Sequence, residues 1–270
     1  MKYALIFDDF SHIFAPANAL FFKALVIAAI LLEVAVCPVR AEPSLKPEQI
    51  PNILVEKGKN LSALKAVMSI QSMYDGGKSR QDVKGFLLYR RPSDFRFQGI
   101  GPSGNSLFEL VIRATHFELY VPTDGKILKG EKDCFARKFP DVAEIEGLIP
   151  ILLLQWKDVR FDRLLLRDNE KIVLRVTFQG RVWGITLEPQ NLFLKRLVRL
   201  SPGGETDLTA DFGDFSSGED GWLPRRFEVQ SPQGGWKTLV RISKIETNPF
   251  IVEKNFLLEP VFSTSTESCR

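Results

Sequence analysis

Few residues in this chain of 270 residues could support catalysis. It has two histidines, His12 near the N-terminus and His116 in the middle of the chain. A serine hydrolase triad in the main part of the chain would need His116, but no G-x-S-x-G nucleophile elbow is present. His116 also lies at the start of an expected strand, where a structural histidine is more common than a catalytic base. The sequence therefore gives no support for a Ser-His-Asp site.

Sites for metals and for phosphates also lack support. A histidine-based metal centre needs partner ligands that are absent, and no C-x-x-C pair occurs. Residues 99–104 match G-x-G-x-x-G, but Pro102 interrupts them. No helix is expected after them to hold a phosphate at its N-terminus. We interpret these residues as a hairpin loop, and we expect no metal and no cofactor.

Carboxylate pairs such as Asp141 and Glu144 are common on solvated surfaces, and their spacing alone does not make a glycosidase pair. We therefore predict that the protein is not an enzyme. A hydrolase of the cell envelope, with carboxylates brought together from distant positions, is kept as the weakest of three functional hypotheses.

The charge of the chain is small and dispersed. Lys and Arg number 36 against 33 Asp and Glu, and the net charge of +3 is not gathered into the basic stripe that a nucleic-acid partner would require. Apolar residues make up 44%, enough for a substantial core, and the 21 phenylalanines could line an apolar cavity or enlarge that core. We expect one folded domain and no nucleic-acid partner.

The first 41 residues resemble an export sequence. The apolar run 24–32 has the length of a signal-peptide core, and Lys23 precedes it. Small residues at the third and first positions before Glu42 favour cleavage at that point. Two alternatives stay open, an uncleaved N-terminal anchor and lipid attachment at Cys37. In each case residues 42–270 form the exported β domain.

Two further cysteines follow Cys37, namely Cys134 and Cys269. They could form a disulfide in an oxidising compartment. Cys269 is the penultimate residue, however, and chain ends usually fray. We therefore do not expect a structural disulfide.

The main part of the chain reads as a series of strands. A short helix is expected over residues 47–59, and after it the apolar period changes to two. Glycine-containing turns separate the strands, which indicates an antiparallel meander. The predicted strands are 94–98, 106–113, 116–121, 171–178, 181–187, 191–200, 205–212, 223–230 and 236–245.

Residues 141–156 break this pattern, because they are apolar on nearly all sides between Leu148 and Leu154. The segment is too short to span a bilayer, and an all-round apolar helix must be buried. Pro150 should kink it or start a new turn. We expect one or two short helices that fill the concave side of the sheet. The predicted fold is mainly β: a single antiparallel curved sheet, or incomplete β-barrel, with an N-terminal helix and short helices covering the concave face.

Three short segments occur in a recognisable order: YRRPSDFRF at 89–97, LYVPTDGK at 119–126 and NFLLEP at 255–260. They resemble the strand that ends in basic-Arg-Pro, the exposed hairpin and the closing Phe-x-x-x-Pro strand of one family. That family is the periplasmic lipoprotein carriers and outer-membrane lipoprotein receptors, the LolA/LolB-like proteins. The likeness covers most of residues 47–262.

The resemblance implies an apolar inner surface that accepts acyl chains beneath a helical cover. In the carriers, the arginine before the proline helps hold the lid and couples it to cargo release, and Arg91 occupies that position. The side chains that we expect to line the cavity are Phe95, Phe97, Phe108, Leu110, Leu148, Leu152, Trp156 and Trp183.

The leading hypothesis is a non-enzymatic protein of the periplasm, or of the periplasmic face of the outer membrane. It would bind lipid acyl chains or lipoproteins and serve lipoprotein sorting to the outer membrane. The second hypothesis is a structural or scaffolding module for a protein partner, with its inner face packed shut by residues 148–156. A cavity well under about 300 Å³ would favour the second. We expect a monomer, with envelope membrane proteins as further partners.

Overall fold

The structure is a computed structural model, and it describes residues 46–152, 156–218, 221–258 and 265–269. The described residues all belong to one compact unit, Lys46–Arg270. The predicted export sequence and its alternatives, including lipid attachment at Cys37, lie outside the described residues.

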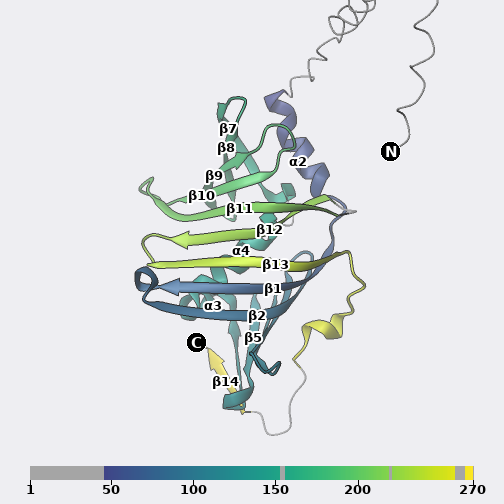
Figure 1. Cartoon of the computed structure of the whole chain (residues 1–270), viewed down its shortest axis with the longest axis vertical. Helices are drawn as coiled ribbons and strands as arrows, with labels where there is room; N and C mark the ends of the chain where they lie inside the picture. Colours follow the sequence, from purple (N-terminus) through teal and green to yellow (C-terminus); the bar gives the residue numbers. More distant parts are fainter. Residues whose placement is uncertain (1–45, 153–155, 219–220, 259–264, 270) are drawn as a thin grey trace, which may run out of the picture. The chain divides into compact units, whose positions relative to one another are not determined.

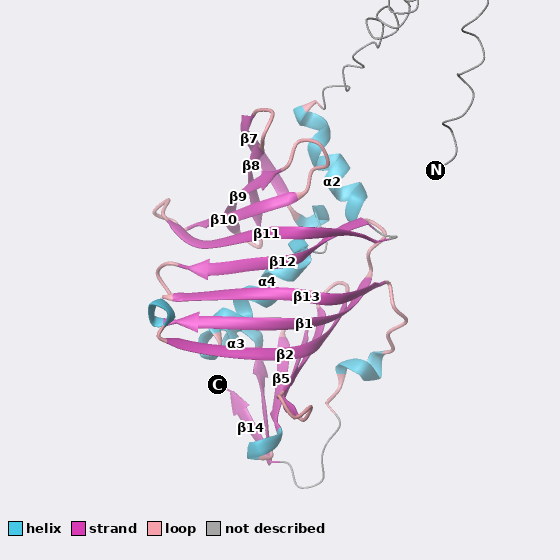
Figure 2. Cartoon of the chain, viewed as in Figure 1, coloured by secondary structure: helices cyan, strands magenta, loops and turns pink. Residues whose placement is uncertain are grey.

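The described residues contain fourteen strands in one mixed sheet that does not close into a barrel (Figures 1 and 2). The order across the sheet is β14-β6-β5-β4-β3-β2-β1-β13-β12-β11-β10-β9-β8-β7. Neighbouring strands are antiparallel, except that β14 pairs in parallel with β6. The strands are β1 (Ala63–Tyr74), β2 (Ser79–Arg90), β3 (Asp94–Ile100), β4 (Ser106–Arg113), β5 (His116–Val121), β6 (Lys126–Glu131), β7 (Arg160–Arg167), β8 (Ile172–Phe178), β9 (Arg181–Leu187), β10 (Leu194–Leu200), β11 (Thr206–Gly218), β12 (Gly221–Ser231), β13 (Trp236–Thr247) and β14 (Ser265–Cys269).

Two meanders make up this sheet, one of β1 to β6 and one of β7 to β13. They join where β1 pairs with β13, in a register that runs from Leu64 opposite Thr247 to Tyr74 opposite Trp236. The predicted class, a mainly β protein built on a single open sheet with an N-terminal helix, is confirmed. The parallel pairing of β14 is the part of the topology that the prediction did not include.

Alternating side chains explain most of the strands. In β8, Ile172, Leu174, Val176 and Phe178 are buried while the residues between them are partly exposed, as a strand with one face in the core requires. Each predicted strand range is present, some with shifted ends. Strands β1, β2, β6, β7 and β14 are not among the predicted ranges. Their sequences mix polar and small residues into the apolar positions or, in β7, interrupt the alternation with a run of leucines.

The expected N-terminal helix is present as a 3-10 turn, η1 (Pro47–Gln49), followed by helix α2 (Ile50–Gly58). A proline in the first turn of α2 is tolerated because the N–H that it lacks has no partner there. Ile50 and Leu54 are fully buried, so one face of this short helix packs into the core.

The apolar segment 141–156 forms most of helix α4 (Pro140–Leu152) and the first residue of the 3-10 turn η4 (Trp156–Asp158). Pro150 lies inside α4. Helix α3 (Lys132–Lys138), which the sequence did not predict, precedes it and follows β6. None of the described helices is both long enough and apolar enough to cross a membrane.

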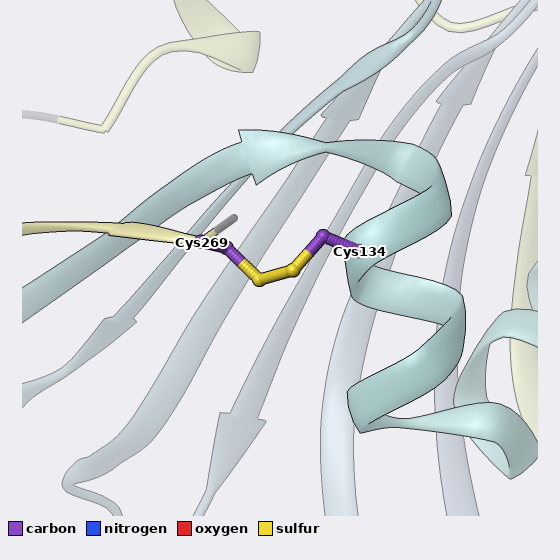
Figure 3. The surroundings of a disulfide bond; sticks show 2 residues. All are labelled: Cys134 and Cys269. Atoms are coloured by element: carbon purple, nitrogen blue, oxygen red, sulfur yellow. A yellow bond between two sulfur atoms is a disulfide. The ribbon is translucent and has the colours of Figure 1, made fainter.

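A disulfide joins Cys134, on α3, to Cys269, at the end of β14 (Figure 3). The expectation that these cysteines stay unpaired is therefore wrong. The parallel pairing of β14 with β6 holds the C-terminal strand in place, and α3 starts directly after β6. The sheet thus brings the two Cα atoms to 6.1 Å, a normal separation for a disulfide.

The segment after β13 packs on the outer face of the sheet. The 3-10 turn η5 (Glu253–Phe256) stands where the sequence led us to expect a closing strand, and that expectation is wrong. Phe256 is buried in a small cluster with Val111 and Ile127, and its ring lies 5.1 Å from the guanidinium carbon of Arg90. Pro260 of the predicted motif lies outside the described residues.

Candidate functional site

The inner face of the sheet encloses a cavity of about 540 Å³. Strands β1 to β5 supply one side of its wall, with contributions from β12 and β13. Residues of α3 and α4 supply the other side, and Figure 1 shows both helices on one side of the sheet, behind β1 and β13. Nearly all of the lining side chains are apolar, so the cavity suits an apolar ligand.

Four of the eight predicted lining residues reach this cavity, namely Phe95, Phe97, Phe108 and Leu110. Three others, Leu148, Trp156 and Trp183, are buried but are not part of its wall. The side chain of Leu152 lies outside the described residues. Lipid binding by any of these residues stays a prediction.

Two glycines shape the cavity wall beneath the aromatic side chains. Gly85 and Gly99 face each other across β2 and β3. A Cβ atom on Gly85 would lie 2.6 Å from the ring of Phe97, and one on Gly99 would lie 2.5 Å from the ring of Phe108. The two rings therefore lie over bare backbone, with their centroids 5.8 Å apart. This arrangement leaves the volume above them open.

The cover over the cavity is built from α3 and α4. Phe135 packs against Phe117 of β5, with ring centroids 5.1 Å apart, and against Phe139, at 5.3 Å. Val142 and Ile145 of α4 continue the apolar lining. The cover thus rests on aromatic packing at one end of the cavity.

The polar residues of the wall gather around the end of β1. The hydroxyl of Tyr74 donates a hydrogen bond of 2.6 Å to Oδ2 of Asp141, at the start of α4. Burial, followed by the hydrogen bond to Asp141 and the charge of that carboxylate, raises the pKa of Tyr74 from 10.0 to about 12. Tyr74 is therefore a neutral donor at physiological pH, and Asp141 is its acceptor.

Two further acidic residues fix α4 in place. Glu144 accepts a hydrogen bond of 2.5 Å from Arg199 of β10 and forms a longer ion pair with Arg181. Glu146 pairs with Lys132 of α3 at 2.6 Å. The sequence suggested a solvated surface for Asp141 and Glu144, but the structure uses both to attach α4 to the sheet.

Arg199 is the buried partner in this arrangement, with only 9% of its side chain exposed. Its Nε also donates to Asp207 at 2.7 Å, and its guanidinium lies 5.7 Å from the ring of Trp183. Burial tends to lower the pKa of Arg199, but the hydrogen bonds to Glu144 and Asp207 outweigh it and raise that pKa. Arg199 therefore stays charged and paired inside the protein.

Arg91 lies in the turn between β2 and β3, and burial lowers its pKa. Its Nη2 donates a hydrogen bond of 2.6 Å to the backbone carbonyl of Gly58, at the end of α2. The side chain thus contacts the N-terminal helix, and this contact supplies no part of the cavity wall. The coupling of Arg91 to a lid and to cargo stays a prediction.

The cavity divides the sheet into two regions. Strands β1 to β6 with β12 and β13 form the hollow half, and β7 to β11 form the filled half, none of whose described residues lines the cavity. In the filled half Ile185, Leu197 and Leu208 have no exposed surface. The ring of Trp156 lies 6.3 Å from that of Phe161 on β7, and α2 contacts η4, so helical elements close this side.

Comparison with solved structures agrees with this architecture. A LolA superfamily protein from Nitrosomonas europaea matches with a TM-score of 0.57 and 12% identity, over 77% of this chain and 97% of that one. The fold is LolA-like. A putative outer membrane lipoprotein-sorting protein domain from Vibrio parahaemolyticus matches with a TM-score of 0.54 and 14% identity, over 80% of this chain and 97% of that domain.

A third match to the LolA-like fold is a DUF1329 family protein from Desulfovibrio piger, with a TM-score of 0.61 and 9% identity, over 79% of this chain and 97% of that one. No protein-family model matches the sequence, and no curated protein matches it significantly. The likeness therefore lies in the fold, and it agrees with the family resemblance read from the three short sequence segments.

The sequence analysis missed the polar end of the cavity. Ser72, Tyr74 and Asp141 were not candidates, because each is an ordinary residue in its local sequence. One signal was available in β1, where alternate residues change from Leu64, Met68 and Ile70 to serine and tyrosine. A strand whose inner face turns polar at one end predicts a cavity with a polar end.

Proposed function

We propose that this is a non-enzymatic protein of the cell envelope that binds acyl chains of lipids or lipoproteins in the cavity of its hollow half. The observation that carries the proposal is an apolar cavity of about 540 Å³ between the sheet and its helical cover, within a LolA-like fold. Ligand sites commonly measure about 300–1,000 Å³, so this one has the size for a lipid tail. The volume also argues against the scaffolding hypothesis in its original form, which required an inner face packed shut.

Burial of an acyl chain supplies enough free energy without any catalytic group. Each CH₂ removed from water contributes about 0.8 kcal/mol, so a chain of about fourteen such groups gains on the order of 10 kcal/mol before binding losses. The wall offers aromatic rings and branched aliphatic side chains to receive it. In this proposal the protein acts in lipoprotein sorting to the outer membrane.

The disulfide supports a place for the protein outside the reducing cytosol. Cys134 and Cys269 are bonded although one of them lies at the end of the chain, and such bonds persist in oxidising compartments. Together with the export-like first 41 residues, this favours the periplasm or the periplasmic face of the outer membrane.

A second candidate function, binding of a protein partner, has one specific observation in its favour. Among the described residues, strand β7 is at one edge of the sheet, and it exposes Leu164, Leu165 and Leu166 by 36–49%. Natural proteins usually protect such edges. A partner that adds a strand to β7 would cover these leucines.

The test of the acyl-chain proposal combines native mass spectrometry with dye uptake. Protein purified from envelopes should carry a lipid-sized adduct, and after delipidation it should take up a neutral phenylnaphthylamine dye. The substitution Ile70→Trp fills the cavity and should lower dye affinity at least tenfold. Absence of both the adduct and the dye uptake would overturn the proposal.

The matched control is Phe86→Trp on β2. Phe86 is 44% exposed, and it lies on the face of the sheet opposite to its neighbours Gly85 and Leu87, which face the cavity. The Phe86→Trp variant should bind the dye with the same affinity as the unmodified protein. Equal loss in both variants would mean that the dye binds elsewhere.

A further inference from the structure

The polar end of the cavity is an organised cluster rather than a scatter of side chains. Ser72 of β1 lies directly between Gln81 of β2 and Thr238 of β13 in the sheet register. The hydroxyls of Ser72 and Thr238 are 2.9 Å apart and hydrogen-bonded. Two residues further along β1, Tyr74 donates to Asp141. Three strands and one helix thus place polar atoms at one end of an otherwise apolar wall.

Solvent reaches the polar side chains at this end of the cavity. Ser72 and Thr238 are buried, but Gln81 is exposed and both Tyr74 and Asp141 are partly exposed. At the opposite end of β1, Leu64 is only 3% exposed. About eight residues of strand separate Leu64 from Ser72, or about 26 Å. An acyl chain can therefore lie along β1 with its tail toward Leu64 and its head among the polar side chains.

The charged residues of the cavity wall also bear on which head group it can accept. Of the described residues that line the cavity, Asp141 is the only charged one, and no lysine, arginine or histidine is among them. Asp141 has no ion-pair partner within the described part of the chain. The only proton of the Tyr74 hydroxyl is already donated to Asp141. The polar end is thus an acceptor site with a negative charge.

From this arrangement we propose that the cavity selects acyl chains whose head group is not anionic and donates hydrogen bonds, such as an N-acyl amide or an ammonium. An amide N–H or an ammonium head can donate to the free oxygen of Asp141 and to the Tyr74 oxygen. A fatty-acid carboxylate would instead stand beside a like charge in a partly desolvated site, where both ions are disfavoured.

This inference rests on the proposed function, because it names the class of acyl ligand that the same cavity takes. Asp141 and Tyr74 determine specificity through the head group, while the apolar wall supplies affinity through the tail. The Gln81 amide, which both donates and accepts hydrogen bonds, can pair with the carbonyl of the same head group. The assignment therefore uses three of the four polar side chains that line this end of the cavity, and the fourth, Ser72, is hydrogen-bonded to Thr238.

The experiment compares three ligands with the same alkyl chain by displacement of the neutral dye at neutral pH. They are an N-acyl ethanolamide, an alkylammonium and a fatty-acid carboxylate. The protein should bind the first two at least tenfold more tightly than the carboxylate. The substitution Asp141→Asn should reduce this ratio below threefold, chiefly by tightening binding of the carboxylate.

Asp168→Asn is the matched control, because it makes the same change of charge at an exposed turn between β7 and β8, where backbone N–H groups bind the side chain. It should leave the ratio unchanged. A carboxylate that binds as well as the amide, or a ratio that Asp141→Asn does not change, overturns this inference while dye uptake still supports the proposed function. Failure of all three ligands to displace the dye overturns both.

Discussion

The hollow half and the filled half of this sheet have the same alternating strand pattern, but only one of them leaves an open volume on its inner face. In the filled half, aliphatic side chains such as Ile185 and Leu197 occupy the inner face without exposed surface. In the hollow half, the corresponding positions on β2 and β3 include Gly85 and Gly99, over which aromatic rings lie. An open volume in a β sheet protein therefore depends on a few inner positions rather than on its topology.

Helix α4 spans both regions and shows the difference within one element. Four of its residues line the cavity, namely Asp141, Val142, Ile145 and Ile149. Leu148 and Ile151, in its second half, are fully buried outside that wall. Residues on one face of the helix thus border the cavity, and residues beside that face fill the core.

The largest expected effect comes from matched isoleucine truncations in the two halves. Ile185→Ala in the filled half should lower the free energy of unfolding by about 3–4 kcal/mol, because a fully buried side chain leaves a void. Ile70→Ala in the hollow half should cost about 1 kcal/mol, since its side chain already borders open volume. Urea denaturation followed by circular dichroism measures both. Equal losses would contradict the distinction between the two halves.

A smaller effect should separate two arginines on β10. Arg199→Ala leaves Glu144 and Asp207 without their buried partner and should cost about 2–3 kcal/mol. Arg196→Ala removes a pair with Asp211 whose two side chains are 55% and 40% exposed, and it should cost about 0–1 kcal/mol. Thermal denaturation of both variants is the measurement. A small loss for Arg199→Ala would show that α4 does not depend on this ion pair.

The smallest effect concerns the pH dependence of the polar end. The pKa of Tyr74 is raised to about 12 from 10.0, so folding favours its protonated form. This stabilisation is fully present below pH 10 and is lost as the pH rises toward 12. Asp141→Asn should move the pKa of Tyr74 back toward 10 but not fully, because burial is the largest cause of the shift. Ultraviolet titration at the tyrosinate band, with Tyr74→Phe as the subtraction control, tests this, and an unchanged titration curve would contradict it.

The sequence predicted the elements that have a regular pattern of apolar residues. Alternation over residues such as 172–178 identified strands, and the all-round apolar stretch near Leu148 identified a buried helix. Four of the eight predicted lining residues reach the cavity, two from β3, which alternates cleanly, and two from β4, where Phe108 and Leu110 were expected on one face. Leu148 and Trp156 are buried as their hydrophobicity requires, but a sequence does not say whether an apolar side chain borders a void or fills it.

The parts that escaped prediction depend on contacts between distant residues. Tyr74 and Asp141 are 67 positions apart, and Cys134 and Cys269 are 135 positions apart. Neither pairing has a local signal, because each arises from how the strands are ordered across the sheet. The pairing of Tyr74 with Asp141 and the disulfide therefore depend on where β1 and β14 lie in the sheet.

The two borders of the sheet differ in a way that limits how copies of the protein could assemble. At one border, β14 is a strand of five residues that a disulfide ties to α3. At the other, β7 is longer and carries exposed leucines. An open sheet can polymerise end to end if both of its edge strands can pair with another copy. If only one edge strand can pair, assembly stops at a dimer. We infer that the short, cross-linked strand β14 leaves β7 as the border of the described sheet that is more open to pairing with another strand.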